Sequence, residues 1–286
     1  MDSRIISLYD EYTHAPLPRT TFLSRLAELA GGKSAAEALL PKLENNYAEA
    51  STVAPDDPRL VTGAVTFSSG EEQVMGYLAR PKEDGKRPGV VVIHENRGLN
   101  AHIEDVARRA AASGFLALAP NALSPFGGTP DDEDEARNLI GQLDAGETLQ
   151  RFLAAVTYLK DHDECSGKVG CVGFCWGGAM ANQLAVHSPD VQASVPFYGR
   201  QASAEDAARI QASLLLQYGE HDERINAGIA DYEAALKTNG VEHTIHIYEG
   251  CHHAFHNDTS ESRYNAVAAH LAWQRTVDFL HEKLGG

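Results

Sequence analysis

The stretch that decides the fold reads Lys-Val-Gly-Cys-Val-Gly-Phe-Cys-Trp-Gly-Gly and covers residues 168–178. Its first half is an apolar run typical of a buried strand, and a helical pattern begins near Trp176. Gly173 and Gly177 flank Cys175 at the spacing of a strand–turn–helix elbow, the turn that exposes a nucleophile at the top of a sheet. The stretch therefore predicts that Cys175 is a nucleophile.

The elbow explains the glycines, because strand and helix approach each other closely there and the turn itself is strained. It also places the Cys175 sulfur at a helix N-terminus, where unpaired amides and the helix dipole favour a thiolate over a thiol. The alternative is a buried structural cysteine in an ordinary turn between strand and helix. Cys171, inside the strand, is interpreted as a core residue.

Short apolar runs alternate with longer amphipathic segments on both sides of the elbow. The expected strands cover residues 61–67, 74–79, 90–94, 115–119, 169–174, 193–197, 214–218 and 244–248. The expected helices cover residues 103–113, 133–143, 146–161, 176–187, 227–238 and 262–283. Apart from the first two strands, which a turn at residues 69–71 joins as a hairpin, the strands read as buried on both faces. The pattern predicts an α/β-hydrolase fold, a mostly parallel central sheet with helices on both faces.

Residues 1–58 follow a different pattern. Apolar residues recur at helical spacing, as in Phe22, Leu26 and Leu29, and predict two or three short helices. Two prolines within residues 54–58 indicate a linker. We therefore expect a helical N-terminal extension, residues 1–58, and an α/β-hydrolase domain, residues 59–286. Whether the extension mediates formation of a homodimer is left open.

The partners of the nucleophile are expected after later strands, first an acid and then a histidine. Asp222 follows the strand at 214–218, at the carboxyl end where ligands bind in open α/β sheets. His253 follows the strand at 244–248 and precedes Ala-Phe. We predict Asp222 and His253 as these partners. The competing residues at the two positions are Glu220, Glu223 and His252.

Composition excludes several classes of function. The formal net charge of −16 argues against a nucleic-acid or anionic-membrane partner, because phosphate binding needs a clustered basic surface. Four cysteines without Cys-x-x-Cys spacing indicate free thiols in a reducing compartment. Neither a secretory signal nor a membrane-length apolar run is found, so we expect a cytoplasmic protein.

Two patterns resemble metal sites and are interpreted otherwise. The residues around His253, from Cys251 to His256, lack a second ligand group at a suitable spacing. The acidic run at 131–135 follows a proline and predicts the first turn of a helix, where the dipole favours carboxylates. We predict no metal and no cofactor.

From about residue 61 to residue 284 the sequence resembles the dienelactone hydrolase family, the carboxymethylenebutenolidases. The matching stretches are Val-Val-Val-Ile-His-Glu-Asn-Arg-Gly-Leu-Asn at 90–100, Gly-Phe-Cys-Trp-Gly-Gly at 173–178, and the loops at 219–222 and 253–255. The resemblance implies a Cys-Asp-His triad. It also implies that Glu95 contacts the nucleophile and helps to govern its ionisation.

We expect the backbone amides of Asn96 and Trp176 to form the oxyanion hole, since the elbow supplies one donor and the loop after the first core strand supplies the other. Family members hold a carboxylate-bearing lactone through arginines, and Arg97 is our candidate for such a residue. Tyr198, at the end of another core strand, is a candidate for the pocket wall. The N-terminal extension and the Asn96-Arg97 pair, which stands where the family has apolar residues, depart from the family pattern and put the lactone itself in doubt.

We expect a carboxylic-ester hydrolase that cleaves an ester or lactone of a small molecule through a thioester on Cys175. The first alternative is a general carboxylesterase or thioesterase with the same triad and a different pocket. The second is a non-catalytic thiol redox sensor, for which an oriented Asp-His pair would be superfluous.

Overall fold

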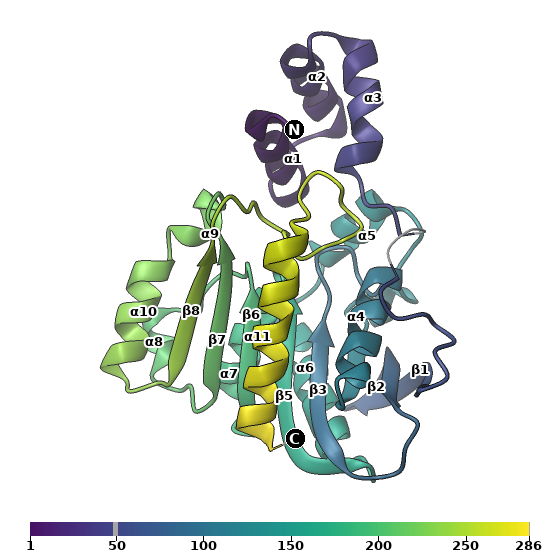
Figure 1. Ribbon diagram of the computed structural model, residues 1–286, viewed down its shortest axis with the longest axis vertical. Coiled ribbons are helices and arrows are strands. Elements are labelled where there is room, and N and C mark those ends of the chain that lie inside the picture. Colours follow the sequence, from purple (N-terminus) through teal and green to yellow (C-terminus); the bar gives the residue numbers. More distant parts are fainter. Residues whose placement is uncertain (48–50, 286) are drawn as a thin grey trace.

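The computed structural model describes residues 1–47 and 51–285, and it contains one mixed sheet with the strand order β1-β2-β4-β3-β5-β6-β7-β8 (Figure 1). The strands are β1 (Leu60–Ser69), β2 (Glu72–Pro81), β3 (Arg87–Ile93), β4 (Leu116–Pro120), β5 (Cys165–Phe174), β6 (Val191–Phe197), β7 (Ser213–Gly219) and β8 (His243–Tyr248). β2 pairs antiparallel with β1 and β4, and every other pairing is parallel. The predicted α/β-hydrolase architecture, including its hairpin, is confirmed.

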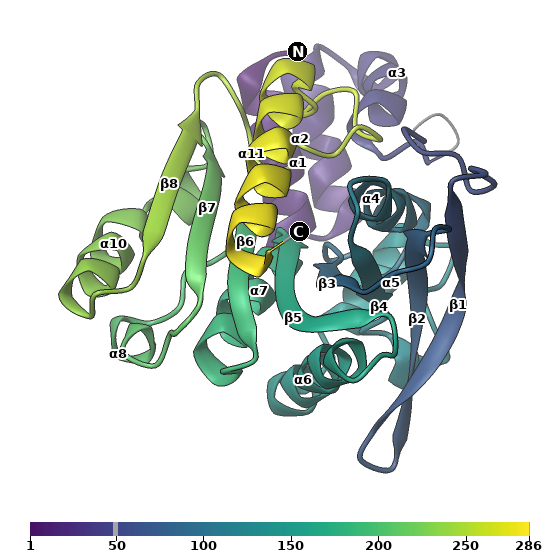
Figure 2. The same ribbon diagram turned by 60° about the horizontal axis from the view of Figure 1, so that its bottom comes forward.

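Helices cover both faces of the sheet, as Figures 1 and 2 show. α4 (Ala101–Ala112) and α11 (Ala266–Leu284) pack on one face around the inner strands. The opposite face is covered by α6 (Ala145–Lys160), α7 (Trp176–His187) and α10 (Ile229–Thr238). The shorter elements are α5 (Glu133–Ile140), α8 (Ala204–Ala207), α9 (Glu223–Asn226) and the 3-10 turn Ser124–Phe126. Asp132 caps α5, so the acidic run is the start of a helix, as predicted.

Three elements near the C-terminus differ from the sequence prediction. β8 was expected to be buried on both faces, but it is the edge strand and most of its residues are partly or fully exposed. The helix expected at 227–238 is present as α10, which begins at Ile229, and a separate short helix that the sequence prediction lacked, α9, precedes it. The last helix begins at Ala266 because the Asn265 side chain accepts a hydrogen bond from the Ala268 amide and caps it there.

The N-terminal extension consists of α1 (Ser3–His14), α2 (Arg19–Ala30) and α3 (Lys33–Leu43), and it sits over one end of the sheet (Figure 1). The helices have their own apolar core, in which the rings of Tyr12 and Phe22 stack with centroids 4.4 Å apart. Among the described residues of this extension, Met1 is the only large apolar residue that is exposed. The described part of the extension thus presents no exposed apolar face that would support a homodimer, and homodimerisation stays a prediction.

Charged side chains join the extension to the rest of the protein. The Arg19 guanidinium lies 3.1 Å from the Asp134 carboxylate, and the Arg263 guanidinium lies over the Tyr9 ring, 5.1 Å from its centroid. A cation–ring contact such as the one between Arg263 and Tyr9 contributes about 0.5–2 kcal/mol. The extension is thus docked on the loops at the carboxyl edge of the sheet.

In the part of the chain that the structure describes, no helix combines the length and apolar character needed to cross a bilayer. The cytoplasmic location stays a prediction.

Phe22→Ala tests whether the extension depends on its own core. Phe22 is fully buried, so removing its ring should lower the free energy of opening of α1–α3 by about 3–5 kcal/mol. Hydrogen exchange of the backbone amides measures this loss helix by helix. Leu23→Ala, at a partly exposed position on the same helix, is the matched control and should cost less. Equal protection in Phe22→Ala and the unmodified protein would contradict the packing described here.

Candidate active site

Cys175 is the single residue that connects β5, which ends at Phe174, to α7, which begins at Trp176. Its backbone has φ 55° and ψ −111°, a conformation that non-glycine residues rarely adopt, and its amide donates to the Phe197 carbonyl at 3.0 Å. The strand–turn–helix setting predicted from the sequence is confirmed. The sulfur lies at the N-terminus of α7, where the helix dipole favours negative charge.

The glycines around the elbow permit close backbone contacts. A Cβ atom on Gly173 would lie 2.0 Å from the Gly177 carbonyl oxygen, and one on Gly177 would lie 2.4 Å from the His94 carbonyl oxygen. Both distances are far below van der Waals contact. The interpretation of these glycines as residues that let strand and helix approach is confirmed.

The loops after β7 and β8 bring Asp222 and His253 together. The His253 Nδ1 lies 2.6 Å from the Asp222 Oδ2, and both side chains are buried. Two of the competing residues have other partners: Glu220 accepts a hydrogen bond from the Gly250 amide at 2.7 Å, and the His252 ring lies beside His221. Glu223 is exposed at the start of α9. Asp222 and His253 thus form an oriented acid–imidazole pair next to Cys175.

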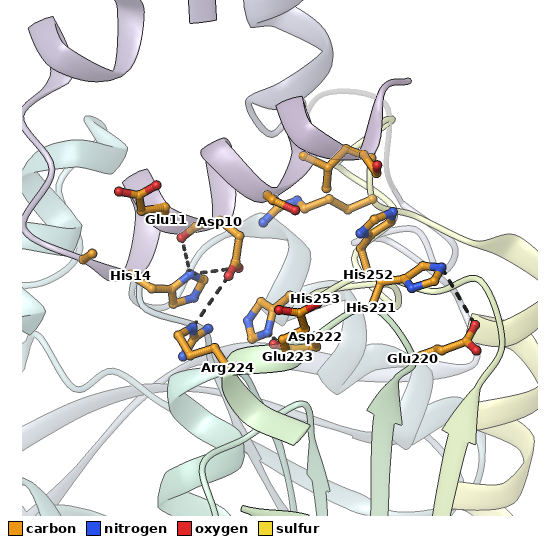
Figure 3. Close-up of a pocket in the computed structure, with 15 residues that line it drawn as sticks. Asp10, Glu11, His14, Glu220, His221, Asp222, Glu223, Arg224, His252 and His253 are labelled. Atoms are coloured by element: carbon orange, nitrogen blue, oxygen red, sulfur yellow. Dashed lines mark hydrogen bonds and ion pairs between the residues drawn. The ribbon is translucent and has the colours of Figure 1, made fainter. Parts of the chain in front are cut away.

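An unexpected second imidazole contacts the sulfur. The Nε2 atom of His14, the last residue of α1, lies 3.0 Å from the Cys175 Sγ at hydrogen-bond distance. The Nε2 of His253 is buried and has no hydrogen-bond partner among the described residues. Figure 3 shows the Asp10–His14 and Asp222–His253 pairs next to each other, and the two imidazole rings meet edge to face with centroids 4.6 Å apart.

The electrostatics of the centre favour a charge-separated state. Burial opposes ionisation of the Cys175 thiol, but the His14 and His253 imidazoles outweigh it and lower the pKa of the thiol to about 6. Burial likewise opposes charge on His253, yet Asp222 and Cys175 raise the pKa of its imidazole well above the usual value. The thiolate is therefore present above about pH 6 and is lost as the pH falls below it.

Glu95 follows β3 and lies near the sulfur, since both residues line the same narrow cavity. Its carboxylate accepts hydrogen bonds from the Asn257 side chain at 2.7 Å and from the Tyr198 hydroxyl at 3.4 Å. Among the described residues no hydrogen bond joins Glu95 to Cys175. The expected contact between this glutamate and the nucleophile stays a prediction.

The two expected oxyanion-hole residues lie on either side of the elbow. Trp176 is the first residue of α7, so its amide has no acceptor within the helix. Asn96 follows β3, and its side chain donates to the Thr13 carbonyl at 2.8 Å, which ties this loop to α1. Their role as oxyanion donors stays a prediction.

A cavity of about 580 Å³ opens beside Cys175 and has the size of a small-molecule site. Tyr198 lines it, as expected for a residue of the pocket wall. Arg97 does not: its side chain is buried against Asn96 and Glu133 beside the narrow cavity. The arginines that line the larger cavity are Arg137, Arg200 and Arg224.

The side chains of His14, Cys175 and His253 could also hold a metal ion. Among the described His, Cys, Asp and Glu residues, they form the only group of three whose ligand atoms all lie within 4.8 Å of one another. The sulfur and one imidazole are already joined by a hydrogen bond, and a nucleophile elbow functions without a metal. We interpret the group as a site of proton transfer.

Residues 74–284 match the model of the dienelactone hydrolase family. The chain belongs to the dienelactone hydrolase family. Protein usf of Aquifex pyrophilus is 36% identical over a match that covers 77% of this chain and 98% of that protein. A Synechocystis protein named "Putative carboxymethylenebutenolidase" is 34% identical, with 78% and 97% covered. The crystal structure of a dienelactone hydrolase-like promiscuous phosphotriesterase from metagenomic libraries superposes with a TM-score of 0.72 at 28% identity, with 79% of this chain and all of that one covered.

The match to the dienelactone hydrolase family does not include the N-terminal helices, because it begins at residue 74. Asp10 and His14 therefore belong to a part of the chain for which the family provides no expectation. Sequence reasoning missed them for this reason. The only local signal is their spacing of four residues, which places both side chains on one face of a helix.

Gly177→Ala tests the close contact at the elbow. The added methyl group would overlap the His94 carbonyl, so the variant should lose at least about 1–3 kcal/mol in its free energy of unfolding. Denaturant unfolding measures the loss. Gly63→Ala is the control, because nothing lies within 4 Å of its Cβ position and its φ is ordinary. Equal stability of the two variants would contradict the described geometry.

Proposed function

We propose that this member of the dienelactone hydrolase family cleaves an ester or lactone bond of a small molecule, with Cys175 as nucleophile and a thioester intermediate. The observation that carries the proposal is the strained elbow of Cys175 beside the buried His253–Asp222 pair, whose nitrogen and oxygen lie 2.6 Å apart. A nucleophile, an imidazole and an acid that orients the imidazole are the components of a triad.

In the first half of the cycle the Cys175 sulfur bonds to the carbonyl carbon, and the π electrons move to the carbonyl oxygen. The backbone amides of Asn96 and Trp176 would bind this oxyanion. The carbon–oxygen bond then breaks, and the leaving oxygen takes a proton from the His253 imidazolium. A thioester on Cys175 results.

In the second half His253 is neutral and removes a proton from a water molecule, which adds to the thioester carbon. The carbon–sulfur bond breaks, and the sulfur leaves as a thiolate. The products are an acid and an alcohol, or a single ring-opened molecule if the substrate is a lactone. Asp222 orients His253 and stabilises its charged form in both halves.

The lining of the larger cavity supports a substrate that carries an acidic group. Arg200 is exposed at the cavity, and its guanidinium forms no hydrogen bond or ion pair with another described residue, whereas Arg137 is held by Asp134 at 3.3 Å. Guanidinium groups bind carboxylates through paired hydrogen bonds. We therefore place a carboxylate-bearing lactone or ester ahead of a neutral ester, with Arg200 in the role that sequence reasoning proposed for Arg97.

A panel of lactones, aryl esters and thioesters, with and without a carboxylate, tests the function in the presence of a chelator. Cys175→Ala should abolish turnover, and Asp222→Asn should lower kcat by about 10³–10⁴-fold because the imidazole loses its orienting charge. Glu220→Gln is the matched control and should keep activity, since this carboxylate contacts a backbone amide instead.

The preferred substrate separates a lactonase from a carboxylesterase or thioesterase. Equal turnover by Cys175→Ala and the unmodified protein would refute the mechanism. Loss of activity on chelation alone would indicate a metal-dependent reaction instead.

A further inference from the structure

We propose that His14, at the end of the N-terminal helix α1, is a second catalytic histidine, which holds a proton against the Cys175 sulfur and keeps it a thiolate. The proposal rests on Cys175 being the nucleophile of the proposed function. It starts from the 3.0 Å contact between the His14 Nε2 and the Cys175 Sγ. His14 is the imidazole that is hydrogen-bonded to the sulfur, although α1 lies outside the residues that match the family.

The other side of the His14 ring is held by α1 itself. Its Nδ1 lies 2.9 Å from the Asp10 carbonyl oxygen and 3.0 Å from the Asp10 carboxylate. The carboxylate also lies 3.6 Å from the Arg224 guanidinium across the cavity (Figure 3). An imidazole with oxygen acceptors at Nδ1 directs its Nε2 toward the sulfur, which is the orienting arrangement that Asp222 provides for His253.

The position of His14 is fixed by the same loops that carry the active site. The carbonyl groups in the last turn of a helix lack internal partners. Here the Arg137 side chain donates to the Tyr12 carbonyl at 3.0 Å, and the Asn96 side chain donates to the Thr13 carbonyl at 2.8 Å. The end of α1 is therefore bonded to the loop after β3 and to α5, both of which border the cavity.

The charges around the sulfur are arranged to keep it ionised. The charged and titratable groups that line the two cavities containing Cys175 are His14 from α1, Glu95 and Arg97 after β3, Arg137 of α5, Tyr198 and Arg200 after β6, Arg224 after β7, and His253 and Arg263 after β8. Asp10 and Asp222 contact the two imidazoles from behind. Burial opposes charge on His14, but Cys175 and Asp10 raise the pKa of its imidazole above the usual value. Two cationic imidazoles therefore face one sulfur.

With two imidazoles at the sulfur, His14 and His253 can each handle a different proton. The resting thiol gives its proton to His14, and that proton stays on His14 throughout the cycle. His253 alone gives a proton to the leaving oxygen and recovers one from water. When the carbon–sulfur bond of the thioester breaks, the sulfur leaves as a thiolate beside the His14 imidazolium. All protons and electron pairs balance with ester and water as the only reactants.

The pH dependence of alkylation by iodoacetamide tests the proposal without any ester substrate. All four cysteines are buried, but Cys175 lines the larger cavity and the other three do not. Burial also raises the pKa of Cys171 to about 12 and that of Cys251 to about 11. Mass spectrometry of the full chain assigns the adduct. The rate at Cys175 should rise with pH through an inflection near 6.

His14→Gln should move this inflection upward by about one to three pH units, the usual effect of removing an opposite charge at contact distance. Asp10→Asn, which preserves shape and removes the charge beside the imidazole, should move it in the same direction by less. Glu11→Gln is the control on the same helix, because Glu11 pairs with Arg25 at 2.8 Å, and it should leave the inflection in place. The inflection is compared rather than the rate, because the intrinsic reactivity of a thiolate rises with its pKa.

An unchanged inflection in His14→Gln would overturn the proposal, and so would an unchanged inflection in Asp10→Asn should His14→Gln fail to fold. The result is separable from that of the ester panel. A shifted inflection without any ester turnover would remove the proposed function and leave the thiolate–imidazole pair intact. Cys175-dependent turnover with an unshifted inflection would support the proposed function and overturn the role of His14.

Discussion

The constraint on which the rest of the site depends is the close backbone contact at the elbow after β5. Gly173 and Gly177 approach so closely that Cys175 must take a left-handed backbone conformation, and the turn thereby presents the sulfur at the N-terminus of α7. β7 and β8 run parallel to β5 and end at the same edge of the sheet. Their loops deliver Asp222 and His253 to the sulfur, although 31 residues separate the two in sequence.

The elbow makes the sulfur reactive only in combination with charge. A buried thiol without a cationic partner stays protonated, as Cys171 does in the strand that leads to the elbow. Cys175 differs because two imidazoles face it, one from the α/β domain and one from the extension. The extension thus completes the electrostatic environment of a site whose framework belongs to the dienelactone hydrolase family.

Much of this could be predicted from the sequence. The elbow has a local signature, and the strands after it are continuous apolar runs, so the fold and the relative order of Cys175, Asp222 and His253 followed from periodicity and topology. The edge position of β8 did not, because an apolar run does not reveal whether a neighbouring strand covers it. The sequence also does not reveal that Arg97 is buried against Glu133 and so does not line the larger cavity, because that contact joins residues 36 positions apart.

His14 could not be found by the same reasoning. Its contact with Cys175 joins residues 161 positions apart and depends on how a separate set of helices docks on the sheet. No periodicity encodes that docking, which is made by individual contacts such as Asn96 to Thr13. Contacts of this kind become visible only in three dimensions.

In the proposed reaction Cys175 carries the acyl group during turnover. The most direct test is to quench the enzyme with acid in the steady state on an activated aryl ester or thioester that it hydrolyses, and to map the protein by mass spectrometry. We expect the acyl mass on the peptide that contains Cys175, and we expect hydroxylamine to remove it, as it does from a thioester. Turnover with no acyl adduct on Cys175, or with the adduct on another residue, would contradict it.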